Sequence, residues 1–168
     1  MKAVVSIIMG STSDLPVMEK AAAFLDSIHV PFEMNALSAH RTPAAVEEFA
    51  KGAQARGIKV IIAAAGMAAA LPGVIAANTN VPVIGVPIKG MLDGLDAMLT
   101  IIQMPPGIPV ATVGVNGAQN AAILAAQILA VADSELAARL AAHKEGLKDK
   151  IEKANAELSQ VKYNYKTN

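Results

Sequence analysis

The stretch KVIIAAAGMAAALPGVIAANTNVPVIGV, residues 59–86, holds two short runs of Val, Ile and Ala on either side of a segment with Gly and Pro. The runs Lys59–Ala64 and Val81–Val86 are almost continuously apolar instead of alternating, which is typical of parallel strands buried on both faces. Parallel neighbours need a crossover connection, and the residues between the runs are numerous enough to include a helix. The stretch therefore predicts a strand–helix–strand unit inside an α/β domain.

The apolar segment Val60–Ala77 is also long enough to raise the question of a membrane span. Gly66, Pro72 and Gly73 interrupt it, and much of it is alanine, which partitions weakly into lipid. A buried strand followed by a turn and a buried helix explains the segment better, so we expect no membrane association. The formal net charge of +0 gives no support for a nucleic-acid partner or an anionic membrane surface either.

The same alternation of apolar runs and helical segments continues on both sides of this unit. Thr42 is a candidate cap for a helix that has Pro43 in its first turn and ends before Gly57. The other segments are strands at Lys2–Met9, Phe32–Leu37 and Pro109–Val113, and helices at Leu15–Ile28 and Ala118–Val131. This order predicts a three-layer, doubly wound, five-stranded parallel sheet of the flavodoxin-like type, formed by residues 1–132.

A long helix is expected at the C-terminus, over about Ser134–Lys162. Its apolar positions recur mostly every three or four residues, at Leu136, Leu140, Leu147, Ile151, Ala154, Leu158 and Val161. Residues 133–168 would then belong to the same domain and add little core of their own. The helix either packs along its own domain or crosses a subunit boundary. We favour the second, because only 17% of the residues are charged and 54% are hydrophobic.

Cysteine is absent, which removes disulfides, thiolate nucleophiles and zinc–cysteine sites. The absence fits a reducing compartment, and we expect a cytoplasmic protein. The three histidines, His29, His40 and His143, are scattered without the spacing of metal ligands. We therefore expect no metal site.

Two loops that follow strands carry polar side chains. In Gly10-Ser-Thr-Ser-Asp14, hydroxyls and free N–H groups precede a helix, where an anion is favoured; helix capping is the alternative explanation. In Ser38-Ala-His-Arg-Thr-Pro43, His40 can carry a proton near neutral pH and Arg41 can hold a phosphate with two parallel hydrogen bonds. A solvated loop is the alternative there. Carboxyl ends of parallel strands meet at one sheet edge, so both loops are expected there, with Ala65–Gly73 and Pro87–Gly94.

The segment Ala63–Gly73 has almost no side-chain chemistry. Close packing of a strand against a helix explains it without any function. The functional alternative is a narrow pocket in which backbone N–H groups meet a carboxylate or carbon dioxide.

Together these loops closely resemble the 5-(carboxyamino)imidazole ribonucleotide mutase family. The matching segments, in family order and spacing over about the first 135 residues, are Met9-Gly-Ser-Thr-Ser-Asp14, Ser38-Ala-His-Arg-Thr-Pro43, Leu71-Pro-Gly73, Pro82-Val-Ile-Gly-Val-Pro87, Gln103-Met-Pro-Pro-Gly-Ile-Pro-Val-Ala-Thr112 and Ala121–Ala130. The resemblance implies a cofactor-free enzyme of purine biosynthesis that acts on a small ribonucleotide, with residues 1–132 as its catalytic domain. It also implies a homo-octamer with sites between subunits.

Carried over by position, the resemblance makes His40 the general acid/base and gives Arg41 the phosphate and Asp14 the ribose. The other expected substrate-binding residues are Ser11, Ser13, Ser38, Ala65, Gly66, Ala70 and Leu71. Two segments depart from the family. Gly66-Met-Ala-Ala-Ala-Leu-Pro-Gly73 stands where many members have Gly-Gly-Ala-Ala-His-Leu-Pro-Gly, so Ala70 replaces a His, and Lys89–Gly94 has a less usual composition.

The resemblance implies a reaction in which a carboxylate moves from a nitrogen to a neighbouring ring carbon, by loss and recapture of carbon dioxide. This reaction needs only one group that titrates near neutral pH, and His40 supplies it. Two alternatives stay open. A related carboxylase would use free carbon dioxide, but that type resembles Ser-Ala-His-Lys, and Arg41-Thr-Pro43 favours the mutase. A non-catalytic nucleotide-binding module on the same fold would give no reason for His40 beside Arg41.

Overall fold

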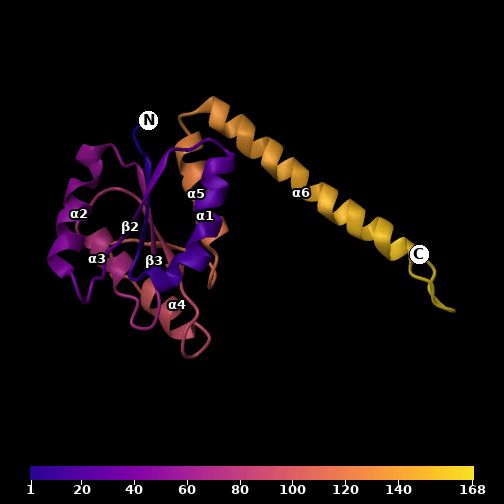
Figure 1. Cartoon of the computed structure of the whole chain (residues 1–168), viewed down its shortest axis with the longest axis horizontal. Helices are drawn as coiled ribbons and strands as arrows, with labels where there is room; N and C mark the ends of the chain where they lie inside the picture. The colour runs from indigo at the N-terminus through magenta and orange to yellow at the C-terminus, as the bar shows by residue number, and fades with distance from the viewer.

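The computed structural model describes all 168 residues and contains a five-stranded parallel sheet in the order β2-β1-β3-β4-β5. Helices cover both faces of this sheet (Figure 1). The strands are β1 (Val5–Met9), β2 (Phe32–Ala36), β3 (Val60–Ala65), β4 (Val83–Pro87) and β5 (Ala111–Thr112). This is the flavodoxin-like strand order, so the predicted fold class is confirmed. The order reverses between β1 and β3, and the carboxyl ends of these two strands flank the crevice where such sheets bind ligands.

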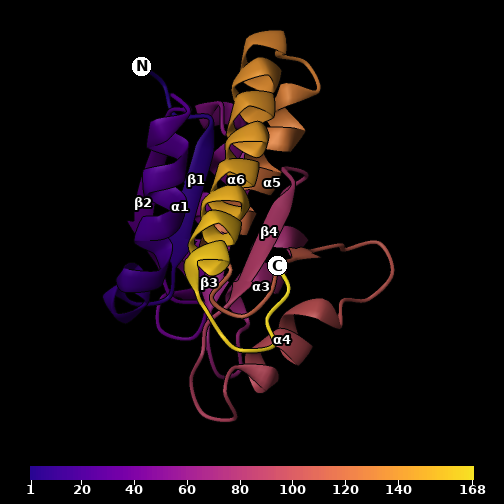
Figure 2. The same ribbon diagram turned by 90° about the vertical axis from the view of Figure 1, so that its right-hand side faces the viewer.

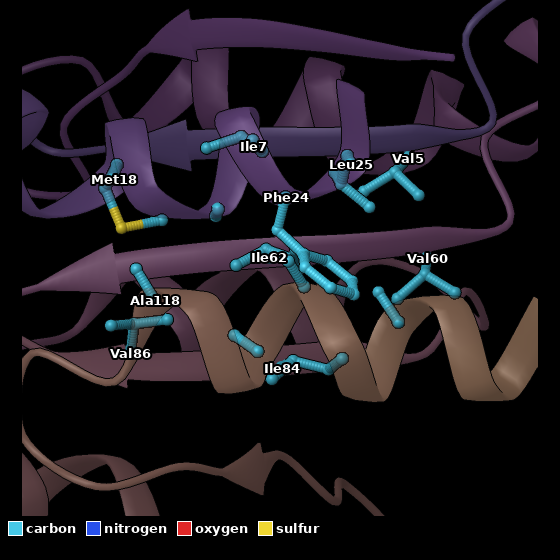
Figure 3. Packing of buried hydrophobic residues seen from close by; sticks show 14 of the residues in the cluster. Val5, Ile7, Met18, Phe24, Leu25, Val60, Ile62, Ile84, Val86 and Ala118 are labelled. Atoms are coloured by element: carbon cyan, nitrogen blue, oxygen red, sulfur yellow. The ribbon is translucent and has the colours of Figure 1, made fainter. Parts of the chain in front are cut away.

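Side chains of the central strands alternate between two buried clusters, one on each face of the sheet. Ile7 of β1 and Ile62 of β3 are paired in register and face the same layer, formed by α1 (Leu15–Ser27) and α5 (Ala118–Ala130) (Figure 3). The neighbouring Ile8 belongs to the opposite cluster. That second face is covered by α2 (Pro43–Arg56), α3 (Leu71–Ala77) and α4 (Leu95–Ile102). Burial on both faces explains why β3 and β4 are continuously apolar and why Ser6 is the only polar residue of β1.

The helix α2 begins at Pro43 and ends at Arg56, as predicted, because Gly57 adopts a left-handed φ of 93° at its C-cap. Thr42 occupies the N-cap position, but its hydroxyl makes no cap hydrogen bond. The Thr42 hydroxyl instead donates to the Ser38 carbonyl and accepts from the Ser38 N–H, both at 3.0 Å. Thr42 therefore closes the preceding loop instead of capping the helix.

The short helix α4 was not predicted from the sequence. It follows Gly94, which has a φ of 87° and provides no side-chain cap. The helix packs closely on β4, where a Cβ placed on Gly85 would lie 2.4 Å from Ile101 Cγ2. Only glycine permits that approach, so the Gly in β4 is explained by α4. The outer face of α4 leaves Leu95, Leu99 and Ile102 exposed.

The long helix α6 (Ser134–Gln160) projects away from the domain (Figures 1 and 2). Only its first turns pack on α5, and Leu136 is its one buried residue. Arg139 Nε donates to the Ile28 carbonyl at 2.9 Å and holds this end against the domain. Beyond that point, Leu147, Ile151 and Leu158 are exposed. No helix of the structure combines the length and the apolar character needed to cross a bilayer.

Candidate functional site

A cavity of about 480 Å³ lies at the carboxyl ends of β1, β2 and β3, formed by the three loops that follow these strands. All ten predicted site residues line it: Ser11, Ser13, Asp14, Ser38, His40, Arg41, Ala65, Gly66, Ala70 and Leu71. Gly10, Ala39, Met67 and Ala69 complete the lining. The sheet topology thus brings together residues that are up to sixty positions apart in the sequence.

The first loop is a 3₁₀ turn, Thr12–Asp14, capped by Ser11. The Ser13 N–H donates to Ser11 Oγ at 3.3 Å, and the Asp14 N–H donates to the Ser11 carbonyl at 3.1 Å. Asp14 is the N-cap of α1, yet its carboxylate makes no cap hydrogen bond. The carboxylate accepts from the Ser13 hydroxyl, at 3.3 Å, and keeps capacity to accept from a ligand. Capping in this loop is therefore done by Ser11 and not by Asp14.

Partial burial raises the pKa of Asp14 above its ordinary value of 3.8. Hydrogen bonds from the Ser13 side chain and the Ser11 backbone oppose this effect, but desolvation is the largest cause. The folded protein therefore holds this carboxylate in a setting less favourable to its charge than water. A ligand that donates hydrogen bonds to Asp14 would relieve that cost.

The second loop is held by its own polar side chains. The Arg41 N–H donates to Ser38 Oγ at 3.2 Å, and Thr42 bridges to the Ser38 backbone. The Arg41 guanidinium reaches back to the first loop, where Nη2 donates to the Gly10 carbonyl at 2.7 Å. This contact argues against a merely solvated loop, because it fixes the cation against the first loop. His40 is exposed at the mouth of the cavity.

The third loop supplies an apolar wall. Ala65 at the end of β3 and Leu71 at the start of α3 are both buried. Between them, the Ala69 N–H donates to the Gly66 carbonyl at 2.9 Å and closes a tight turn. Met67 has a φ of 54° and its side chain is 69% exposed, yet it lines the cavity. The sequence placed the segment at the site but gave no sign of this conformation, since methionine is uncommon at positive φ.

The fourth predicted loop, Pro87–Gly94, does not line the cavity. It turns towards β5 instead, and the Lys89 N–H donates to Asn116 Oδ1 at 2.9 Å. Lys89 Nζ pairs with Asp93 at 3.0 Å within the loop itself. The loop is adjacent to the site only through Ile88, whose Cβ would lie 3.5 Å from a Cβ on Gly66.

Other hollows of similar size lie away from this edge of the sheet. One of about 570 Å³ is lined by Asn78, Thr79 and Asn80, before β4. Another of about 640 Å³ lies between the start of α6 and the loop around His29. The first has no histidine, arginine or carboxylate in its lining. The second has His29, Arg139 and Asp133, but it lies at the amino ends of the strands and not at the carboxyl ends where such sheets bind ligands. No three His, Cys, Asp or Glu side chains gather in a way that could hold a metal ion.

The profile of the family described as AIR carboxylase matches residues 4–150. The chain belongs to that family. The family's curated members include proteins named N5-carboxyaminoimidazole ribonucleotide mutase, so the resemblance stated from the loop motifs is confirmed. One such relative, from Pyrococcus abyssi, is 58% identical over 86% of this chain and 83% of its own length.

Proteins named as mutases and a protein named as a carboxylase are both similar to this chain. A mutase from Mycobacterium tuberculosis H37Rv is 52% identical over 94% of this chain and 91% of its own length. The phosphoribosylaminoimidazole carboxylase of Schizosaccharomyces pombe is 50% identical over 94% of this chain, which spans 29% of that longer protein. The solved structure of Treponema denticola PurE2-S38D superposes with a TM-score of 0.85 at 30% identity, covering 95% of this chain and 100% of that one.

Proposed function

We propose that this protein converts 5-(carboxyamino)imidazole ribonucleotide into 4-carboxy-5-aminoimidazole ribonucleotide in purine biosynthesis. The observation that carries the proposal is one cavity in which His40, Arg41 and Asp14 face an apolar wall, Ala65–Leu71. Identity of 50% or more to proteins named as this mutase, over most of the chain, supports the same reaction.

The polar side of the cavity anchors the ribose phosphate. Arg41 and the Ser11 hydroxyl lie on loops that the Arg41–Gly10 hydrogen bond joins, so a cation and a hydroxyl at the entrance of α1 suit a phosphate. Because the Asp14 carboxylate makes no cap hydrogen bond, it can accept hydrogen bonds from the ribose hydroxyls. With Ser13 and Ser38 in the lining, these groups fix the ring relative to His40.

His40 carries the proton in both directions. The bond between the exocyclic nitrogen and the carboxylate breaks, carbon dioxide leaves, and protonated His40 gives a proton to that nitrogen. The neighbouring ring carbon then attacks carbon dioxide, which leaves the carbon with both a hydrogen and the new carboxylate. Neutral His40 removes that proton and returns to its starting state, so no net proton is gained or lost. The exposed position of His40 at the cavity mouth permits both transfers.

The apolar side of the cavity holds the carbon dioxide between these steps. Ala65, Ala69 and Ala70 present methyl groups, and the turn backbone offers N–H donors without a side chain that hydrates carbon dioxide. Ala70, where the family resemblance implies a histidine in many members, leaves this wall apolar. A carbon dioxide molecule confined beside the ring reacts as in a unimolecular step, which favours recapture over escape.

The chain is proposed to assemble as a homo-octamer with sites between subunits. Two apolar surfaces support assembly: the outer face of α4, with Leu95, Leu99 and Ile102, and the projecting part of α6, with its stripe at Leu147 and Ile151. Exposed leucine and isoleucine at helical spacing are typical of subunit contacts. The cytoplasmic location stays a prediction that rests on the absence of cysteine.

One assay separates the candidate functions. Purified protein is given 5-(carboxyamino)imidazole ribonucleotide without added bicarbonate, and separately the unmodified aminoimidazole ribonucleotide with bicarbonate. Turnover of the first substrate supports the mutase. Turnover of the second alone would support the carboxylase, and tight binding with no turnover of either would support a nucleotide-binding module.

A further inference from the structure

Met67 stands in a backbone conformation that suits glycine better than methionine. Its φ is 54°, and it is the first central residue of the turn that the Ala69 N–H closes on the Gly66 carbonyl. A positive φ at this position is the usual place of a glycine, because a Cβ crowds the backbone there. The side chain at residue 67 therefore adds strain to the loop.

Packing within the domain does not account for the methionine. Its side chain is 69% exposed and belongs to neither buried cluster. Ala69, two residues along, is 3% exposed and packs in the cluster beneath α2 and α3. The hydrogen bond that closes the turn joins the backbones of Gly66 and Ala69, so it does not need a side chain at position 67.

The side chain borders the site instead. Met67 lines the same cavity as His40 and stands at the end of the wall formed by Ala65 and Ala70. Each of those two alanines ends in a single methyl group, so the longer side chain of Met67 adds apolar surface to the same lining. A methionine side chain has three rotatable bonds and a polarisable sulfur, so it adapts its shape to the group bound in the cavity.

We propose that Met67 is an adjustable apolar cover for the carboxylate end of the site, which keeps released carbon dioxide beside the ring. The inference rests on the proposed mutase function. Met67 forms no bond and moves no proton; it is a positioning residue that acts by excluding water and blocking the way out. Carbon dioxide carries no net charge, so a thioether and methyl wall retains it better than an open, hydrated mouth.

The test measures retention of an isotopic label. Substrate with ¹³C in the carboxylate is converted in excess unlabelled bicarbonate, and mass spectrometry measures the fraction of product that still carries ¹³C. In Met67→Gly, the fraction of turnovers that lose label should rise by roughly tenfold, as for a barrier to escape lower by ~1.4 kcal/mol. Met67→Leu keeps apolar bulk and should retain the label. Ala68→Gly, next in the turn but outside the cavity lining, should behave as wild type.

Each outcome bears on the proposal. Because glycine relieves the positive φ, Met67→Gly should melt at the same Tm as wild type or higher; a Tm several degrees lower would show a structural role and overturn the inference. Equal label retention in wild type and Met67→Gly would also overturn it and leave the mutase function intact. Loss of label by wild type itself would refute internal retention and the cover with it. A smaller oligomer with unchanged retention would make Met67 an interface residue instead.

Discussion

Arg41 Nη2 donates a hydrogen bond to the Gly10 carbonyl at 2.7 Å and so joins the loops that follow β2 and β1. The guanidinium has five N–H donors, and this contact uses one Nη group while leaving others for a ligand. The cation is held against the first loop before any substrate arrives. Less side-chain entropy is then lost when phosphate binds.

Arg41→Ala should weaken substrate binding by about 1.5–3 kcal/mol, because a charge-assisted contact to phosphate is lost. Arg41→Lys should recover only part of that loss, since an ammonium lacks the planar fork that reaches Gly10 and the phosphate together. Isothermal titration with the aminoimidazole ribonucleotide measures both. Lys51→Ala removes another exposed cation, on α2 outside the cavity, and serves as the control. Unchanged affinity in Arg41→Ala would refute the phosphate role.

His40→Asn should lower kcat by about 100-fold or more and leave ligand affinity nearly unchanged, because the amide keeps polar character but moves no proton. Steady-state kinetics and a binding titration on the same preparation give the two values. His143→Asn is the matched control: His143 lies on α6, with its ring 4.9 Å from that of Phe24. Turnover near wild type in His40→Asn would remove His40 from the mechanism.

The sheet and the meeting of the site loops could be predicted because both follow from local pattern. Buried runs such as Val60–Ala65 identify parallel strands, and parallel strands place their following loops at one edge. The helix α4 could not be predicted, because its eight residues are mostly apolar and begin without a side-chain cap. Its place depends on the close approach to Gly85, a tertiary contact that no local pattern carries.

The site shows the same division between local and tertiary information. His40, Arg41 and Asp14 could be predicted to lie at one cavity because their side chains have recognisable chemistry next to strand ends. The positive φ of Met67 was not found, since it arises from the turn closed by Gly66 and Ala69 and not from the preference of methionine. Loop Pro87–Gly94 was expected at the cavity, but its hydrogen bond to Asn116 directs it away.

Asp14→Asn should stabilise the free protein at neutral pH. Burial raises the pKa of Asp14, so the folded state binds this proton more tightly than the unfolded state and the ionised carboxylate opposes folding. The gain of the variant over wild type should be full above the raised pKa, shrink as the pH falls, and vanish below the ordinary value of 3.8. Tm measured by circular dichroism across this range checks the direction.

The same variant should bind substrate less well. A neutral amide oxygen is a weaker acceptor than a carboxylate, so KM should rise by about tenfold while kcat changes little. Asp26→Asn, a carboxylate on α1 away from the cavity, controls for the loss of one negative charge. A variant with higher neutral-pH stability but unchanged KM would show that Asp14 does not contact the ribose.

The exposed stripe of α6 gives the last prediction. The helix leaves the domain after its first turns, with Ile151 and Leu158 exposed. Exposing a long apolar stripe to water is unfavourable, and burial against other subunits removes that cost. We expect Ile151→Gln with Leu158→Gln to shift the assembly to smaller species in light scattering, because glutamine keeps helix propensity and removes apolar contact. Glu152→Gln with Glu157→Gln, on neighbouring positions, should leave the assembly unchanged. Turnover should fall in the first double variant alone, since the sites are proposed to lie between subunits. A wild-type monomer at micromolar concentration would contradict both the octamer and the shared site.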